Sequence, residues 1–166
     1  VWLGGGFPEH FAAQLASNAG MHQALRTHAA QGRPIYAECG GLMYLCEWLE
    51  DQQGQRYPQV GLLPGGTRMT TRLQQFGYAE ATFLQDTLLG PAGTSVRGHR
   101  FHYSVYEPGS LLPSCAYRIT RASTGETHAE GFCQGNVLAT YLHVHLGSQP
   151  HMAQYFVDRC QQQRPS

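Results

Sequence analysis

The chain has 166 residues, is 42% hydrophobic, and carries 11 basic and 11 acidic side chains for a formal net charge of zero. This composition excludes a disordered or low-complexity chain, and the length fits one compact domain. All the basic residues are scattered arginines, which gives no electrostatic support for nucleic-acid binding. Without lysine the chain cannot itself supply a Schiff base or a Walker-type phosphate site, and no apolar run approaches the roughly 18 residues of a membrane span.

The five cysteines indicate a reducing, cytoplasmic setting, because their number is odd and they form no Cys-x-x-Cys pair typical of a disulfide framework or a thiolate zinc site. The sequence starts at Val1, without an initiator Met or a basic segment before an apolar core. We therefore expect residues 1–166 to form a single domain that is the C-terminal part of a longer chain.

The first half alternates strands and helices. Residues 2–3 are strand-like and lead into a glycine triplet, and apolar spacing predicts two helices within residues 7–32, with Asn18 capping the second. Residues 33–38 then predict a strand, and residues 41–50 a helix. This order is typical of an α/β fold, an open and mostly parallel sheet flanked by helices.

The second half is dominated by strands, which we expect to add antiparallel members to the sheet. Turn signals containing glycine or proline separate the predicted strands at 67–73, 79–83, 99–106, 116–121, 128–133 and 137–143. A final helix is predicted over residues 150–161, with Met152, Tyr155 and Phe156 as its apolar stripe.

The sharpest chemical signal is a cysteine between small residues where a predicted strand turns into a predicted helix. In Ala37-Glu38-Cys39-Gly40-Gly41 this arrangement has the form of a nucleophile elbow. At a helix N-terminus the thiolate of Cys39 should be favoured, and the amide of Gly40 could stabilise an oxyanion. The alternative is that Cys39 is a small, inert core residue, as free cysteines usually are.

A thiol nucleophile needs a base, and His143 at the end of a predicted strand is our candidate. Functional groups gather beyond the carboxyl ends of parallel strands, so His143 can meet Cys39 there. His145 falls on the same face, as a hydrogen-bonded partner or a side chain facing substrate. The glycine turn after residues 2–3 contains Gly5 and Gly6 and could supply a second oxyanion amide.

The stretch 97–104 is rich in histidine and arginine. Alternation places His99 and Phe101 on one face and Arg100 and His102 on the other. No acidic partner or cysteine pair accompanies the histidines at ligand-like spacing, so we predict no metal site. Contact with a carboxylate-bearing substrate or with a partner domain fits these donors better.

Several motifs together resemble the glutamine amidotransferase domains of the cobyrinic acid a,c-diamide synthase family, a cobyrinate-type branch of the class I enzymes. They are GGGFPE at 4–9, YAECGGLMYL at 36–45, GLLPG at 61–65 with MTTRLQQFGY at 69–78, RGHRFHYS at 97–104 and ATYLHVHLGS at 139–148. The elbow and the late histidine are shared by class I amidotransferases in general, whereas the middle motifs indicate the cobyrinate branch.

The resemblance implies a flavodoxin-like class I fold in which Cys39 attacks glutamine, His143 serves as its base, and amides of Gly40, Gly5 and Gly6 hold the oxyanion. Freed ammonia would pass to an N-terminal synthetase domain, which uses ATP and Mg²⁺ to activate the a and c carboxylates of a corrinoid acceptor. No cofactor is implied for residues 1–166 themselves. The family does not decide between cobyrinic and hydrogenobyrinic acid as the acceptor.

Two positions depart from the usual class I patterns. Where a triad enzyme continues His-x-Glu, this chain has His145, so the carboxylate that orients His143 must be absent or come from elsewhere. Phe7 replaces a frequent Tyr and loses only a hydroxyl. Two further hypotheses remain open, namely an inert docking module of the same fold and an elbow-cysteine hydrolase that acts on another substrate.

Overall fold

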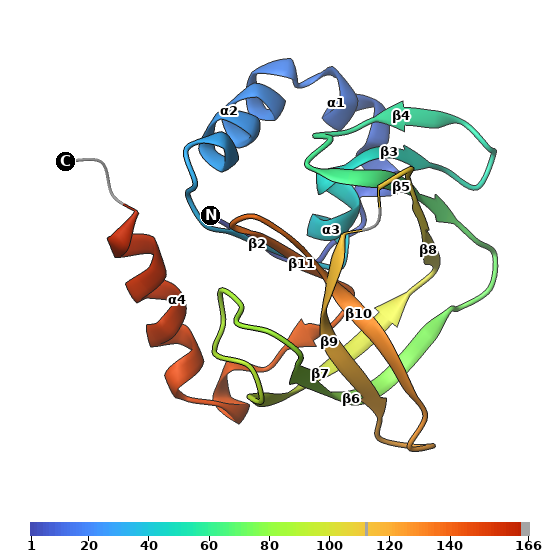
Figure 1. Cartoon of the computed structure of the whole chain (residues 1–166). Coiled ribbons are helices and arrows are strands. Elements are labelled where there is room, and N and C mark those ends of the chain that lie inside the picture. Colours follow the sequence, from blue (N-terminus) through green and yellow to red (C-terminus); the bar gives the residue numbers. More distant parts are fainter. Residues whose placement is uncertain (112, 164–166) are drawn as a thin grey trace.

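The main sheet has eight strands and curls around its own inner face (Figure 1). The computed structural model describes residues 1–111 and 113–163. In sheet order the strands are β1 (Trp2–Leu3), β2 (Ile35–Glu38), β11 (Val137–Thr140), β10 (Thr127–Gln134), β9 (Ser114–Arg121), β6 (Gln75–Phe83), β7 (Ser95–His102) and β12 (His143–Val144). The first three are mutually parallel, and every other pairing is antiparallel.

The predicted α/β class is confirmed, but the parallel part is smaller than expected. In this sheet the parallel neighbours β1, β2 and β11 are joined by long crossovers, as parallel pairing requires. Most of the remaining neighbours, which are β6 with β7, β9 with β10 and β10 with β11, follow one another directly in the chain and pair antiparallel. Antiparallel strands make up most of the sheet for this reason.

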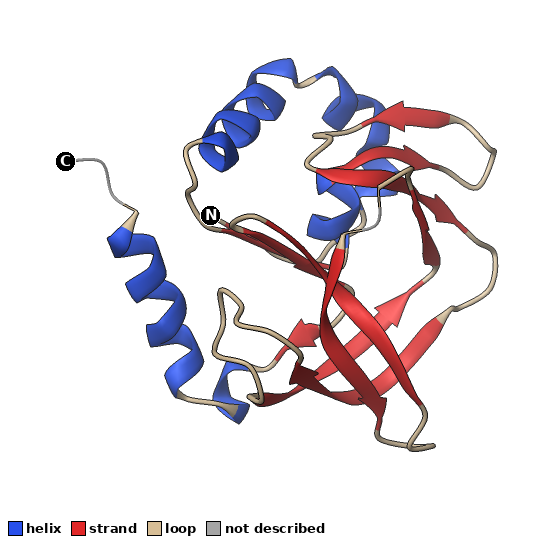
Figure 2. Cartoon of the chain, in the orientation of Figure 1, coloured by secondary structure: helices blue, strands red, loops and turns tan. Residues whose placement is uncertain are grey.

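The helices lie at the upper left and along the left edge in Figure 2, apart from α3 (Gly40–Leu45), which lies among the strands. They are α1 (Ala12–Ser17), α2 (Ala19–Ala30), α3 (Gly40–Leu45) and α4 (His151–Gln162), with short 3₁₀ turns at Pro8–Phe11 and Leu146–Ser148. The predicted break between the first two helices is confirmed, and the side chain of Asn18 accepts a hydrogen bond from the amide of Met21 at 3.1 Å. None of the helices in the described residues is long and apolar enough to cross a membrane.

The helix predicted over 41–50 is wrong in its second half. Helix α3 ends at Leu45, and β3 (Cys46–Glu50) begins directly after it. This strand joins β4 (Arg56–Pro58), β5 (Leu63–Met69) and β8 (Ser104–Pro108) in a second sheet of order β4-β3-β5-β8. Trp48 of β3 covers Gly66 of β5, where any side chain would overlap its ring. Leu49 is buried in the strand, and the helical spacing of the sequence would bury it as well. Pairing with neighbouring strands therefore decides the conformation against the local helical pattern.

The later strands were predicted in the right order but with errors at their ends. The predictions at 79–83, 116–121 and 128–133 lie inside β6, β9 and β10, while 67–73 is shifted from β5. The predicted strand 99–106 bends at Tyr103 and divides between the two sheets, and 137–143 divides into β11 and β12. Side chains keep alternating where the chain passes from one sheet to the other, so the sequence pattern did not reveal these strand boundaries.

Strands β2 and β11 separate two hydrophobic cores. Ile35 and Ala37 of β2 pack into the core beneath α3 and the second sheet, whereas Tyr36 faces the core inside the curled sheet. On β11, Ala139 packs into the core beneath α3, and Leu138 faces the core inside the curled sheet. Both strands are buried on both faces, which fixes the carboxyl ends from which the candidate site is built.

A buried ion pair crosses the inside of the curled sheet. Arg100 of β7 donates to Glu130 of β10, and both side chains are less than a tenth exposed. Glu130 also accepts hydrogen bonds of 2.8 Å from the hydroxyl of Thr140 and the amide of Tyr141. Burial by itself would raise the pKa of Glu130, but His128, Arg100 and these donors together lower it below its ordinary value.

We expect Arg100→Met to lower the free energy of unfolding by about 3–5 kcal/mol, because it leaves the Glu130 carboxylate buried without its partner. Arg97→Met on the same strand is the matched control, since the Arg97 side chain is 80% exposed. Urea denaturation of both variants measures the difference. Equal effects of the two substitutions would contradict a structural role for the buried pair.

Candidate active site

Cys39 occupies a strained turn between β2 and α3. With φ of 46° and ψ of −102°, it has the sole positive φ among non-glycine residues in the part of the chain that the structure describes. Its amide donates to the carbonyl of Thr140 on β11 at 2.8 Å. This is the elbow geometry that the sequence predicted, and it projects the side chain beyond the end of β2.

Glycines let the elbow pack tightly against the turn that follows β1. A Cβ on Gly40 would lie 2.6 Å from the carbonyl oxygen of Gly6, and one on Gly41 would lie 2.5 Å from that of Leu3. Real side chains do not approach a backbone so closely, so both positions require glycine. The predicted oxyanion residues Gly6 and Gly40 are therefore in direct contact.

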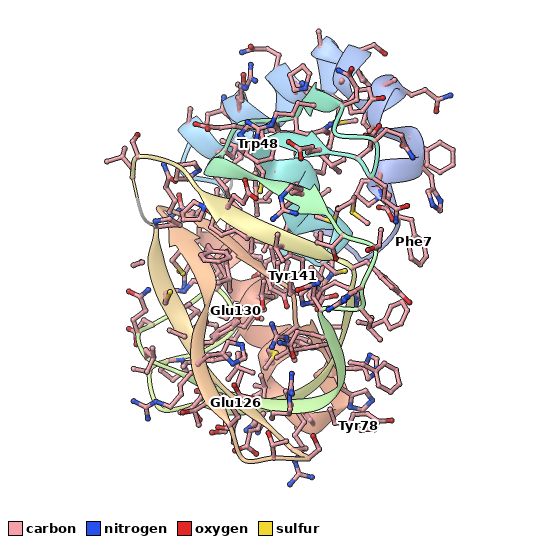
Figure 3. All side chains as sticks on the ribbon, turned by 90° about the vertical axis from the view of Figure 1, so that its right-hand side faces the viewer. Phe7, Trp48, Tyr78, Glu126, Glu130 and Tyr141 are labelled. Atoms are coloured by element: carbon pink, nitrogen blue, oxygen red, sulfur yellow. The ribbon has the colours of Figure 1, made fainter. Side chains whose placement is uncertain are left out.

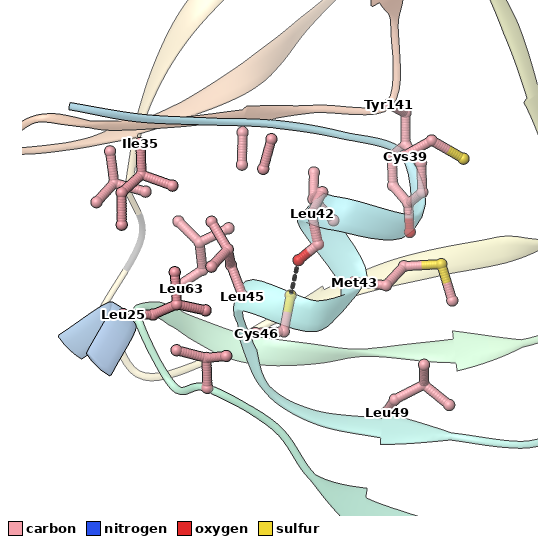
Figure 4. Packing of buried hydrophobic residues seen from close by; sticks show 14 of the residues in the cluster. Leu25, Ile35, Cys39, Leu42, Met43, Leu45, Cys46, Leu49, Leu63 and Tyr141 are labelled. Atoms are coloured by element: carbon pink, nitrogen blue, oxygen red, sulfur yellow. Dashed lines mark hydrogen bonds between the residues drawn. The ribbon is translucent and has the colours of Figure 1, made fainter. Parts of the chain in front are cut away.

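The thiol of Cys39 is nearly buried, with 7% of the residue exposed. Its Sγ donates to the carbonyl oxygen of Phe101 at 3.7 Å. Figure 4 shows the sulfur pointing away from the aliphatic cluster around Leu42. Burial raises the pKa of Cys39 to about 11, an effect that the Gly40 amide only partly offsets. The predicted thiolate is wrong for this state, because burial outweighs the end of a six-residue helix.

The sulfur lines a narrow pocket of about 30 Å³. Its walls include Phe7 and Gly6 from the glycine turn, Met43 of α3, and the end of β7. Such a volume holds roughly two water molecules, so a glutamine side chain can enter only when the lining side chains move.

His143 reaches the same region from the edge strand β12. A Cβ on Gly5 would overlap the imidazole of His143, so the ring lies directly against the glycine turn. On β7, His99 pairs with His143, while Phe101 accepts from Cys39. His99 and Phe101 are two residues apart, so the points at which His143 and Cys39 meet this strand are roughly 7 Å apart. No hydrogen bond joins Cys39 and His143 within the described residues.

A carboxylate that the sequence reasoning did not assign links the strand before Cys39 to the strand of His143. Glu38 immediately precedes Cys39, and its Oε1 accepts hydrogen bonds of 2.9 Å from the amide of Val144 and from the hydroxyl of Tyr36. Burial raises the pKa of Glu38, and these bonds and the charge of His143 offset the rise only in part. An acidic residue at the end of a predicted strand, directly before the candidate nucleophile, was the available signal.

His145 does not take the place of the usual acid. It is exposed, its amide donates to the Arg97 carbonyl at 3.0 Å, and its ring lies against Gly147. His145 and His143 do line one hollow of about 670 Å³, as their predicted common face suggested. The carboxylate that interacts electrostatically with His143 instead belongs to Glu38 of β2.

His102 is a second imidazole beside Cys39, and sequence reasoning placed it only on a strand face. Its Nδ1 lies 2.8 Å from the Ser104 carbonyl, and its ring stacks on Tyr141 at 3.9 Å. Since a carbonyl can only accept, Nδ1 carries the proton and Nε2 is left buried without a partner. Burial lowers the pKa of His102 to about 4, so this ring is neutral at physiological pH.

The sequence matches the model of the CobB/CobQ-like glutamine amidotransferase domain over residues 1–151. The chain belongs to this family. It is 48% identical over 149 residues to a cobyrinate a,c-diamide synthase of Listeria monocytogenes, covering 88% of this chain and 32% of that protein. A synthase of the same name from Syntrophotalea carbinolica is 45% identical over 160 residues, or 95% of this chain and 35% of the other. This glutamine amidotransferase domain thus spans about a third of the relatives' length.

Solved structures show the same fold. A crystal structure of a glutamine amidotransferase superposes with a TM-score of 0.65 at 20% identity, covering 96% of this chain and 78% of the other. Another glutamine amidotransferase, from Thermotoga maritima, gives a TM-score of 0.55 at 12% identity, with 99% of this chain and 66% of the other covered. The predicted class I amidotransferase fold is confirmed.

We expect Gly5→Ala to lower kcat/KM for glutamine by about 100-fold, because its methyl group must displace the His143 ring. The matched control is Gly4→Ala in the same turn, where an added Cβ has nothing within 4 Å. Steady-state glutamate release by both variants checks this. Equal loss in both would show that the turn, and not the position of the imidazole, limits activity.

In the absence of glutamine, Cys39 should react slowly with iodoacetamide at pH 7.5 and faster as the pH rises towards 10, because its pKa is raised to about 11. Cys160 on α4, which is partly exposed, should be modified sooner at pH 7.5 and serves as the internal reference. Peptide mass spectrometry follows both sites. A rate for Cys39 that is already constant above pH 7 would instead indicate a thiolate.

Proposed function

We propose that this domain hydrolyses glutamine by a Cys-His mechanism and supplies the ammonia for amidation of a corrinoid acceptor. The observation that supports this mechanism is that the Cys39 elbow, the glycine turn and His143 lie together. The elbow of Cys39 packs on Gly6, and the neighbouring Gly5 lies against the His143 ring. A nucleophile, a base and oxyanion donors are the parts that acyl transfer needs.

The reaction begins when the imidazole of His143 takes the thiol proton of Cys39. The sulfur then forms a bond to the side-chain carbonyl carbon of glutamine, and the carbonyl oxygen becomes an oxyanion held by amides of Gly40 and the Gly5–Gly6 turn. As the C–N bond breaks, His143 returns the proton and ammonia leaves. Water, activated by the same imidazole, hydrolyses the γ-glutamyl thioester to glutamate and restores the thiol.

His143 is a better base than His102. The buried ring of His102 has its pKa lowered to about 4, so it cannot hold the proton taken from Cys39 at neutral pH. His143 is half-buried, and its ring lies against Gly5 in the turn that packs on the Cys39 elbow. The high pKa of Cys39 also fits a reaction that starts from the neutral thiol only once substrate is bound.

The names and the greater length of the relatives support a particular acceptor and a partner domain. Their name, cobyrinate a,c-diamide synthase, supports amidation of the a and c carboxylates of cobyrinic acid in cobalamin biosynthesis. Hydrogenobyrinic acid is the alternative acceptor. The additional length of these proteins supports an N-terminal synthetase domain that uses ATP and Mg²⁺ to activate the acceptor. The thiol chemistry of this domain requires no cofactor. Five free cysteines support a reducing cytoplasm as its location.

In the full-length enzyme, Cys39→Ser should lower glutamine hydrolysis by roughly 10³-fold or more while amidation from ammonium chloride continues, because only the nucleophile is weakened. Cys160→Ser is the matched control and should behave like the wild type. Glutamate and amide products are measured together. Undiminished glutamate release by Cys39→Ser would remove Cys39 from the mechanism and favour a different hydrolytic site or a docking module.

A further inference from the structure

Glu9 places a carboxylate at the pocket of the nucleophile. It lies in the 3₁₀ turn Pro8–Phe11, directly after the glycine turn whose Gly6 contacts the elbow. Pro8 is buried and the turn packs against α3, so the backbone that carries Glu9 is held in place. The side chain is half-buried, and it borders the narrow pocket that contains the sulfur of Cys39.

The carboxylate of Glu9 has no positive partner. None of the ion pairs among the described residues includes it. The pocket walls in that part of the chain contain no arginine, and burial lowers the pKa of His102 to about 4, which leaves its ring neutral. The charges of Glu9, Glu38 and Glu130 all raise the pKa of Cys39. An electronegative cleft with mostly apolar walls attracts a cation.

Free glutamine carries one cation, its α-ammonium group. In an extended glutamine this nitrogen lies about 5 Å from the side-chain carbonyl carbon that a nucleophile attacks. Cys39 and Glu9 border the same pocket of about 30 Å³, so a glutamine that reaches the sulfur brings its ammonium group within reach of the carboxylate. Phe7, Met43 and Phe101 supply apolar walls that suit the methylene groups of the substrate.

We propose that Glu9 determines specificity for free glutamine by binding its α-ammonium group in the Cys39 pocket. This inference rests on the proposed function and names the residue that recognises one group of its substrate. Hydrogen bonds between an ammonium group and a carboxylate are about twice as strong as neutral ones. A glutamine residue within a peptide has an uncharged amide at this nitrogen and lacks the interaction.

The same contact acts on the nucleophile. Burial is the largest cause of the raised pKa of Cys39, and the charge of Glu9 adds to it. An ammonium group bound to Glu9 offsets that charge, so the thiolate of Cys39 is favoured when substrate is in place. The free enzyme keeps its thiol protonated, which limits reactions with other electrophiles.

The test uses the full-length enzyme carrying Glu9→Gln, which removes the charge and keeps the shape of the side chain. Two diazoketones that alkylate Cys39 are compared, one with the α-ammonium group of glutamine and one without it. Peptide mass spectrometry gives kinact/KI at Cys39, and glutamate release gives KM and kcat. The matched control is Glu126→Gln, where the side chain is 67% exposed and lies away from Phe7 and the glycine turn in Figure 3.

In the wild type, the diazoketone with the ammonium group should label Cys39 faster than the one without it. Glu9→Gln should slow this labelling and raise KM for glutamine by about 30-fold, because a charge-assisted hydrogen bond is lost. Labelling by the diazoketone without the ammonium group should not fall. Glu9→Asp keeps the charge and should restore part of the preference. Glu126→Gln should behave like the wild type.

Other results overturn the proposal. Equal slowing of both diazoketones by Glu9→Gln would assign Glu9 to the structure of the pocket or to proton transfer. An unchanged preference for the ammonium group would mean that another residue binds it. Thermal melting identifies an unfolded variant, and in that case equal labelling of the wild type by the two diazoketones overturns the proposal. Absence of glutamate release by the wild-type enzyme would instead refute the proposed function itself.

Discussion

The left-handed turn at Cys39 is the constraint on which the site depends. A non-glycine residue in such a conformation costs about 1–3 kcal/mol, and the surrounding structure must hold it there. The bond from its amide to Thr140 and the glycine contacts with Gly6 and Leu3 do so. Because those contacts come from β11 and from the turn after β1, the elbow also fixes where the glycine turn lies.

Two buried carboxylates hold the segment that carries His143. Glu130 accepts from Thr140 and the amide of Tyr141 at its start, and Glu38 accepts from the amide of Val144 at its end. Triad enzymes of this class orient the histidine through an acid two residues later, a position occupied by His145 in this chain. Backbone bonds to carboxylates on neighbouring strands fix the position of His143 instead. These bonds hold the backbone from Thr140 to Val144, and with it the position of His143.

The prediction from sequence succeeded where a feature is encoded locally. The break at Asn18, the elbow at Cys39 and the tight glycine turn each depend on a few adjacent residues, and the structure has all three. It failed at β3, where helical spacing and buried strand pairing predict the same apolar positions. It also failed for the ionisation of Cys39, since burial by distant segments reverses the effect expected from the helix end.

The sequence by itself determined the strand-turn-helix around Cys39, the α/β class and the resemblance to the amidotransferase family, because small residues and apolar periodicity act within a few positions of one another. Only the tertiary structure decided which groups meet. The contact of His143 with Gly5 and the bond from the Val144 amide to Glu38 join segments far apart in the chain. Register across a sheet is set by the whole core, and no single segment carries it.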